Sequence, residues 1–238
     1  MKPLNIAIVG ATGLVGSTII SILEQRGTSI NNVYLYASKK SAGKSVYCFN
    51  KDQTIIELTK ENILDKEIDY ALFSAGAETS IMYAPFFTKI NATVIDNSSA
   101  FRVDKTVPLI VPEVNMEDAF TNVGIIANPN CSTIQSVLPL SPIDKVYGIK
   151  SINYTTFQAV SGSGLKGIND LERTRNNVEP LLYPHPIHNN CLPHIDRFLD
   201  NGYTYEEMKM IFETKKILNN QNILISATCV RVPVENSH

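Results

Sequence analysis

A short apolar run followed by three evenly spaced glycines begins this chain. Leu4–Val9 reads LNIAIV, and its branched apolar residues are typical of a buried parallel strand. Gly10, Gly13 and Gly16 come next. An amphipathic stretch up to residue 26 then has helical spacing, with Gly27 placed to cap its end. A strand, a glycine-rich turn and a helix in this order predict a βα unit of an α/β domain.

The glycines of this turn also suit a dinucleotide. They permit a tight turn and a close approach of the backbone to a pyrophosphate, and the N–H groups at the start of the helix attract the anion. The alternative is an ordinary βα turn without a ligand. We expect the cofactor to be bound here by Gly10, Thr12, Gly13, Leu14, Val15 and Gly16.

A second predicted strand, residues 32–37, ends in a basic and hydroxylated segment. NAD-specific sites usually have an acidic residue at this point to hold the ribose 2′-hydroxyl. This chain instead has two lysines and two serines, and these suit a 2′-phosphate. We therefore predict NADP as the cofactor, although a solvated basic turn would look similar. The residues expected at the phosphate are Ser38, Lys40 and Ser41.

Further strands alternate with helical stretches up to about residue 130. Strands are predicted at 70–74, 93–96, 109–111 and 123–127, with a helix over 78–89. This alternation predicts a doubly wound (Rossmann) nucleotide-binding domain with a parallel sheet, which we assign to residues 1–131.

The second half has a different pattern. A long β-rich segment spans 150–160, a helix is expected over 165–175, and a loop rich in proline, histidine and asparagine covers 176–195. Thr204 and Glu207 have the spacing of a capping box, so a helix should run from there to Lys216, before a long strand over 222–234. Residues 132–238 are thus predicted to form an incomplete α+β catalytic and dimerisation domain with a mixed sheet.

Charge and hydropathy exclude several classes of protein. The net charge is −2 and the pI about 6.1, so no basic nucleic-acid surface is expected. No apolar run is long enough for a membrane span, and the N-terminus lacks the features of a secretory signal. Four scattered cysteines then favour reduced thiols in the cytoplasm over a disulfide framework.

Cys131 is the best candidate for a nucleophile. It follows a predicted strand in the polar sequence NPNCST and lies near the expected start of a helix, where the helix dipole favours a thiolate. Open α/β sheets place their sites at such strand ends. For Cys48 and Cys229 the default interpretation is a small buried apolar residue.

The motifs along the whole chain resemble those of the aspartate-semialdehyde dehydrogenase family. They are GATGLVG (10–16), ASKKSAG (37–43), DNSSAFR (96–102), VPEVN (111–115), NPNCST (128–133), FQAVSGSG (157–164), PHPI and LPHID in the loop, ETKKIL (213–218) and VRVPVENSH (230–238). Three of these, FQAVSGSG, PHPI and ETKKIL, look like this family and not like the related N-acetyl-glutamyl-phosphate reductases.

The resemblance implies a reaction. It is the reversible, NADP-dependent reductive dephosphorylation of 4-phospho-L-aspartate to L-aspartate 4-semialdehyde, in the pathway to lysine, threonine and methionine. In the reverse direction a cysteine thiolate adds to the aldehyde, a hydride leaves to give a thioester, and phosphate attacks the thioester. Aspartate semialdehyde and phosphate are the implied small-molecule substrates, and a full-length chain is expected to be a homodimer.

The resemblance also implies residue roles. Cys131 is the nucleophile, His238 the acid/base, and Gln158 the residue that orients the intermediate. Arg231 matches the group that binds the substrate carboxylate, where a planar fork suits the anion. Glu213 matches the partner of the amino group. The other matched positions are Arg102 and Lys216 at the phosphate, Asn130 beside the nucleophile, and Ser161 and Gly162 at the cofactor.

Two features remain open. His185, His188, Cys191 and His194 have a spacing that could bind zinc, although the family gives this loop no metal role, and we predict no metal. The sequence ends at His238, whereas family members continue for roughly another third of this length. We therefore expect weak or no activity and a tendency to associate if this is the whole chain, and the alternative function is a non-catalytic nucleotide-binding remnant.

Overall fold

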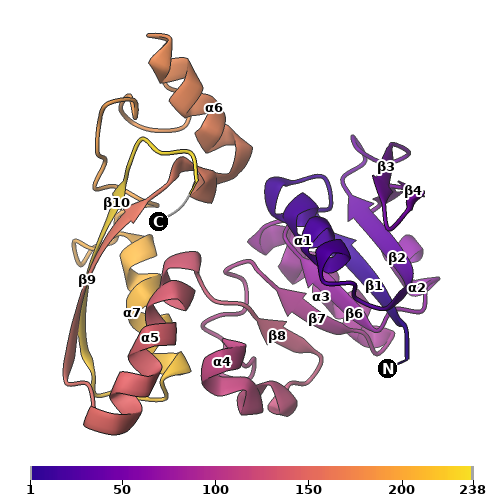
Figure 1. Cartoon of the computed structure of the whole chain (residues 1–238), viewed down its shortest axis with the longest axis horizontal. Helices are drawn as coiled ribbons and strands as arrows, with labels where there is room; N and C mark the ends of the chain where they lie inside the picture. The colour runs from indigo at the N-terminus through magenta and orange to yellow at the C-terminus, as the bar shows by residue number, and fades with distance from the viewer. Residues whose placement is uncertain (1, 237–238) are drawn as a thin grey trace. The chain divides into compact units, whose positions relative to one another are not determined.

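The computed structural model describes residues 2–236, which form two compact units (Figure 1). Within the described residues, the first unit consists of 2–110 and 116–129, and the second of 111–115 and 130–236. The domain bounds of 1–131 and 132–238 remain a prediction. No helix in residues 2–236 is long and apolar enough to cross a membrane.

The first unit is built on a six-stranded parallel sheet, as the alternation of strands and helices predicts. Its strand order is β5-β2-β1-β6-β7-β8, and every neighbouring pair is parallel. The strands are β1 (Leu4–Val9), β2 (Ile30–Ala37), β5 (Ile56–Glu57), β6 (Tyr70–Phe73), β7 (Thr93–Asp96) and β8 (Ile125–Ala127). The helices are α1 (Leu14–Gln25), α2 (Lys60–Leu64), α3 (Ala77–Lys89) and the 3-10 helix η1 (Met116–Thr121).

Strand β1 supplies apolar residues to both faces of the sheet. Ala7 and Val9 belong to a buried cluster that includes Phe87 of α3. Ile8, on the opposite face, belongs to a second cluster with Ile20 of α1. Because side chains alternate along a strand, a continuous apolar run requires helices on both faces, and this confirms the doubly wound class.

Two parts of the first unit differ from the sequence-based prediction. The strand predicted over 109–111 is only an isolated bridge between Leu109 and Ala127, since Pro112 already begins a helix. A hairpin of β3 (Ser45–Cys48) and β4 (Lys51–Thr54) was not predicted, because the segment KDQT has no apolar alternation. Its turn residues Phe49 and Asn50 both have positive φ, at 51° and 60°, as the tightest hairpin turns require.

The second unit contains a pair of parallel strands, β9 (Ser151–Gln158) and β10 (Leu224–Arg231), both shorter than predicted. An isolated antiparallel bridge between Leu192 and Arg231 gives this small sheet its mixed character. The helices are α4 (Pro112–Asn115), α5 (Cys131–Tyr147), α6 (Gly164–Arg175), α7 (Tyr205–Ile217) and the 3-10 helix η2 (Val160–Ser163). Ala227 and Cys229 of β10 point to the same face and pack with Met210 of α7.

Local capping signals fix two helix ends where the sequence predicts them. Thr204 accepts a hydrogen bond from the Glu207 N–H, and the Glu207 carboxylate accepts one from the Thr204 N–H, so the capping box is complete. At the end of α1, Gly27 has φ +59° and donates to Glu24 O, while Thr28 donates to Leu23 O. This pair of bonds is the left-handed cap that glycine favours.

A buried carboxylate orders the loop rich in proline and histidine. Asp170 of α6 accepts backbone N–H bonds from Leu181, Leu182 and Tyr183 at 2.7–3.0 Å. Burial acts to raise the pKa of Asp170, but these three bonds together with the charge of Arg173 hold it below its ordinary value. The ionised carboxylate therefore ties the loop to α6.

Gly16 is required by the close packing of the turn, and its replacement should be costly. A Cβ at this position would lie 2.2 Å from Gly10 O. Because the clashing atoms belong to the backbone, they could move away only by distorting the turn. We expect Gly16→Ala to lower the free energy of unfolding by about 2 kcal/mol or more, because overpacking outweighs the better helix propensity of alanine. Urea unfolding followed by far-UV circular dichroism measures this change.

Gly13→Ala is the matched control. Its Cβ would lie 3.3 Å from the same carbonyl oxygen, so the neighbour needs to move far less. We expect a loss of about 1 kcal/mol, smaller than that of Gly16→Ala, because alanine is a poorer N-cap than glycine but its Cβ requires only a small shift. Equal losses in the two variants would contradict the packing argument.

Candidate functional site

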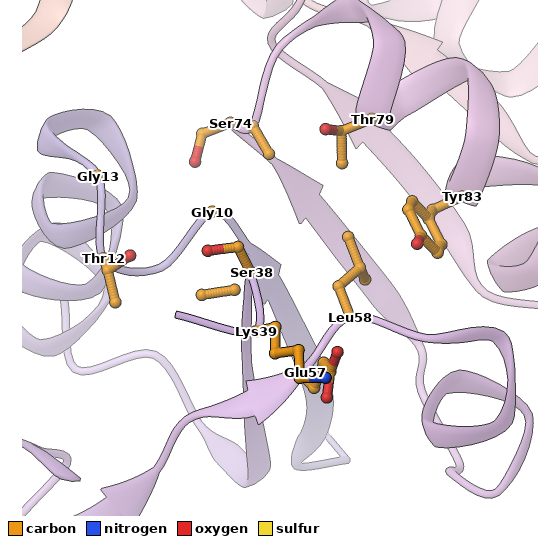
Figure 2. Close-up of a pocket in the computed structure, with 12 residues that line it drawn as sticks. Gly10, Thr12, Gly13, Ser38, Lys39, Glu57, Leu58, Ser74, Thr79 and Tyr83 are labelled. Atoms are coloured by element: carbon orange, nitrogen blue, oxygen red, sulfur yellow. The ribbon is translucent and has the colours of Figure 1, made fainter. Parts of the chain in front are cut away.

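A cavity of about 550 Å³ opens where β1, β2 and β6 end (Figure 2). The glycine turn forms one side, and the segments after β2 and β6 form the others. Because β1 lies between β2 and β6 in the sheet, this is the edge at which doubly wound folds bind ligands. The cavity is lined by Gly10, Thr12, Gly13, Ala37, Ser38, Lys39, Glu57, Leu58, Ser74, Ala75, Thr79 and Tyr83.

The glycine turn fits a dinucleotide. Gly10 has φ +89°, and a Cβ there would lie 3.0 Å from the carbonyl of Ser74. Gly13 is the N-cap of α1 and provides no side-chain cap. The first N–H groups of a helix have no partner within the helix, so this uncapped end can accept a pyrophosphate.

The structure brings only some of the predicted cofactor residues to this cavity. Gly10, Thr12, Gly13 and Ser38 line it, whereas Leu14, Gly16, Lys40 and Ser41 do not. Val15 lines a separate cavity of about 280 Å³, together with Asn97 and Asn128. Gly16 acts through packing. Ser161 and Gly162 lie in the second unit, at η2.

Several lining residues were missed by sequence reasoning. Ser74, Ala75, Thr79 and Tyr83 follow β6, and a signal for them existed in the predicted strand 70–74 and the helix after it. Glu57 ends the short strand β5 and Leu58 follows it, and this strand has no sequence signature of its own. The cavity thus contains one cation, Lys39, and one carboxylate, Glu57 (Figure 2).

Cys131 is the first residue of α5, and its side chain is exposed. Asn130 is the N-cap, and its Oδ1 accepts the N–H groups of Ser132 and Thr133 at 2.9 and 3.4 Å. The sequence-based expectation of a cysteine at a helix N-terminus is therefore confirmed. The helix dipole there favours the thiolate over the thiol.

Glu213 of α7 contacts the residue that precedes this cysteine. It is 2% exposed, and its Oε2 accepts the Asn130 N–H at 2.6 Å. The spacing of Glu213 and Lys216 alone would suggest a surface ion pair, but Glu213 is buried and Lys216 is half-buried.

Arg231 ends β10 and is 5% exposed. Its Nη1 donates to Ala159 O at 2.6 Å, and its Nε has no hydrogen-bond partner. Within residues 2–236, no carboxylate forms an ion pair with Arg231. Gly162 makes room for this side chain, since a Cβ there would lie 2.9 Å from Nη1. A buried guanidinium with donors to spare is suited to an anionic ligand.

Gln158 lies beside Arg231, because the two residues are paired across the β9–β10 ladder. Its side chain is buried, and its Nε2 donates to Thr156 Oγ1 at 3.2 Å. Arg102 belongs to the first unit, where its guanidinium donates to Asn97 O at 2.9 Å. His238 lies outside the residues that the structure describes.

In residues 2–236, the other cysteines and the histidines form neither a second reactive thiol site nor a metal site. Burial is the main cause that raises the pKa of Cys229, to about 11, and it also raises the pKa of Cys48. Both thiols are therefore poor nucleophiles. Among the described residues, which include His185, His188, Cys191 and His194, no group of three or more side chains could hold a metal ion.

Comparisons with known proteins agree with this architecture. Residues 5–122 match the family of semialdehyde dehydrogenase NAD binding domains, and 140–238 match semialdehyde dehydrogenase dimerisation domains. The chain is 51% identical to an aspartate-semialdehyde dehydrogenase of Aquifex aeolicus, over 98% of this chain and 71% of the relative. A Bacillus subtilis aspartate-semialdehyde dehydrogenase is 44% identical over 100% of this chain and 72% of its own length.

Solved structures give the same result. Aspartate semialdehyde dehydrogenase II of Vibrio cholerae, complexed with ASA, superposes with a TM-score of 0.91 at 43% identity, over 99% of this chain and 72% of that one. The Candida albicans enzyme, solved with NADP, has a TM-score of 0.73 at 26% identity, over 99% of this chain and 69% of that one. With both halves matched in order and similarity over 98–99% of this chain at 43–51% identity, the chain belongs to the aspartate-semialdehyde dehydrogenase family.

Proposed function

We propose that this chain catalyses the reversible, NADP-dependent reductive dephosphorylation of 4-phospho-L-aspartate to L-aspartate 4-semialdehyde. The observation that carries the proposal is an exposed cysteine at the first residue of a helix, in a chain of this family. Acyl transfer through sulfur needs a thiolate that can both add to a carbonyl and leave again. The N-terminus of α5 supplies the field that favours this thiolate.

The proposed chemistry begins on Cys131. In the reverse direction its thiolate adds to the aldehyde carbon, and the resulting thiohemiacetal is converted to a thioester. An oxygen of phosphate then attacks the thioester, the C–S bond breaks, and the thiolate returns as the acyl phosphate forms. We assign the proton transfers at the hydroxyl oxygen to His238 and the orientation of the intermediate to Gln158, from the family resemblance.

The proposed binding residues follow the charges of the substrates. The buried Arg231 takes the carboxylate of the semialdehyde, since its donors have no carboxylate partner in the described part of the chain. Glu213 takes the amino group. Arg102 and Lys216 take phosphate, and Asn130 holds the start of α5. We also propose that the second half, which matches a dimerisation domain, forms a homodimer.

NADP fits the residues of the first unit. The uncapped start of α1 suits the pyrophosphate, and Ser38 and Lys39 suit the 2′-phosphate. When bound, the cofactor supplies the acceptor for the hydride that leaves the thiohemiacetal. Lys39, which lines the cavity, replaces Lys40, which does not, as the proposed contact to the 2′-phosphate.

Lys39→Gln should weaken NADP much more than NAD. A charged hydrogen bond to phosphate contributes about 1.5–3 kcal/mol, so the Kd for NADP should rise about tenfold or more. The Kd for NAD, which lacks the 2′-phosphate, should change less than about twofold. Displacement of bound, fluorescent NADPH by NADP or by NAD measures both constants. The matched control is Lys40→Gln, and an equal effect of the two variants would contradict this assignment.

One assay tests the proposed function. The purified chain is mixed with aspartate semialdehyde, NADP and phosphate, and NADPH formation is followed by absorbance. We expect turnover that requires all three reactants. NADP binding without any turnover would refute the proposal and support the non-catalytic alternative. NADPH formation that does not depend on phosphate would indicate a different, hydrolytic aldehyde oxidation.

A further inference from the structure

Asn130, the N-cap of α5, is held on two sides by helix α7. Its backbone N–H donates to Glu213 Oε2 at 2.6 Å, and its side-chain Nδ2 donates to Glu206 Oε1 at 2.9 Å. Its Oδ1 accepts from the first turn of α5. Asn130 and Glu206 are 7% and 6% exposed, so water cannot readily replace these bonds.

The Glu206 carboxylate determines which way the Asn130 amide faces. An ionised carboxylate only accepts hydrogen bonds, so it requires the NH2 end of the amide. The N–H groups of Ser132 and Thr133 require the oxygen end. A rotated amide would place oxygen against oxygen at Glu206 and N–H against NH2 at the helix, and would lose both interactions. Glu206 thus selects the orientation in which Asn130 caps α5.

Lys209 forms an ion pair with Glu206. Its Nζ lies 3.0 Å from Glu206 Oε2 and 2.8 Å from Asp196 Oδ2, above the ring of Tyr205 at 4.8 Å. Burial acts to lower the pKa of Lys209, but the charge of Glu206 and the bonds to both carboxylates raise it above its ordinary value. Lys209 is therefore a stable cation that compensates a buried carboxylate.

We propose that Glu206 and Lys209 are positioning residues for the nucleophile, which act on Cys131 through the amide of Asn130. They touch neither substrate nor cofactor in the proposed reaction. Their role is to hold the first turn of α5 so that its N–H groups and the Cys131 thiolate keep one geometry. The inference rests on the proposed function in taking Cys131 as the nucleophile.

The test is the rate of alkylation of Cys131 by iodoacetamide, resolved by peptide mass spectrometry. This readout does not need turnover, and the exposed Cys191 in the same chain serves as an internal standard. In Lys209→Met, Glu206 loses its cation. We expect Cys131 to react about 10- to 100-fold more slowly, because a disordered first turn of α5 no longer directs its N–H groups at the thiolate, while Cys191 is unchanged. The kcat should fall by a similar factor, with KM changed less than about threefold.

A double variant separates positioning from general stability. Glu206→Gln combined with Lys209→Met removes both charges of the Glu206–Lys209 ion pair, and the glutamine oxygen can still accept from Asn130 Nδ2. We expect this variant to recover most of the Cys131 reactivity, as strongly coupled residues do. If Lys209→Met does not fold, the alkylation rate of Cys131 in the double variant is the measurement that tests the proposal. Lys66→Met, which removes an exposed ion pair in the first unit, is the matched control.

The outcomes are distinct. If folded Lys209→Met alkylates Cys131 within about twofold of the parent rate, the positioning role is overturned. If the double variant is slower than the single one, Glu206 acts through its charge and not through the amide, and the proposal also fails. Failure of the proposed function itself would appear differently: the parent chain would show no phosphate-dependent turnover, although its Cys131 would still be alkylated at the expected rate.

Discussion

Cys131→Ser should abolish phosphate-dependent NADPH formation, with a loss in kcat of about a thousandfold or more. A serine hydroxyl at this position is not ionised at neutral pH, and an oxygen ester is a poorer acyl donor than a thioester. The substitution removes no buried packing, because Cys131 is exposed. We therefore expect the thermal midpoint and the Kd for NADP to stay close to those of the parent chain.

The measurement is steady-state turnover beside a cofactor titration on the same preparation. Cys191→Ser is the matched control, since Cys191 is also exposed and lies outside the proposed site. It should retain full activity. Turnover by Cys131→Ser within about tenfold of the parent would show that the reaction does not proceed through this sulfur.

Arg231→Lys should lower kcat/KM for aspartate semialdehyde by about a hundredfold. The guanidinium offers a planar pair of donors to a carboxylate, and the loss of one charged hydrogen bond in a desolvated site corresponds to roughly 1.5–3 kcal/mol. Lysine keeps the charge and can still donate to Ala159 O, the partner of Arg231 Nη1. The loss should therefore be concentrated in KM for the semialdehyde and leave KM for phosphate nearly unchanged.

The same substitution at an exposed arginine provides the comparison. Arg175→Lys removes only a surface contact to Glu172, which is worth about 0–1 kcal/mol, and should leave kinetics unchanged. If Arg231→Lys instead raises KM for phosphate, the anion recognised by Arg231 is phosphate and not the substrate carboxylate.

The nucleotide-binding unit could be predicted from sequence because its signals are local. The order of strand, glycines and helix and the left-handed cap at Gly27 each need only a few neighbouring residues, as does the capping box at Thr204 in the second unit. The hairpin β3–β4 could not be predicted, since KDQT gains its extended form only by pairing with SVYC. Propensity and periodicity do not report such a pairing.

The residues around Cys131 show a second limit of prediction from sequence. Its place at a helix start follows from the sequence, but the buried carboxylates of α7 do not. On a helix, Glu206, Lys209 and Glu213 resemble an exposed charged face. The two carboxylates are buried and Lys209 is half-buried because α7 packs on α5 and β10, and Asn130 supplies hydrogen bonds that only the tertiary fold brings within reach. Sequence periodicity cannot distinguish a solvated charge from one that is paired inside the protein.

The register of β9 and β10 also has a consequence for the order of folding. Gln158 and Arg231 form the last rung of a parallel ladder, and the segment between them contains α6, the loop anchored by Asp170, and α7. Parallel strands cannot pair through a tight turn, so this whole segment must close before the rung forms. A slip by two residues would keep the buried face but move the two side chains apart by about 7 Å. The pair proposed to face the substrate is thus expected to be completed by a slow, long-range step, after the helices have formed.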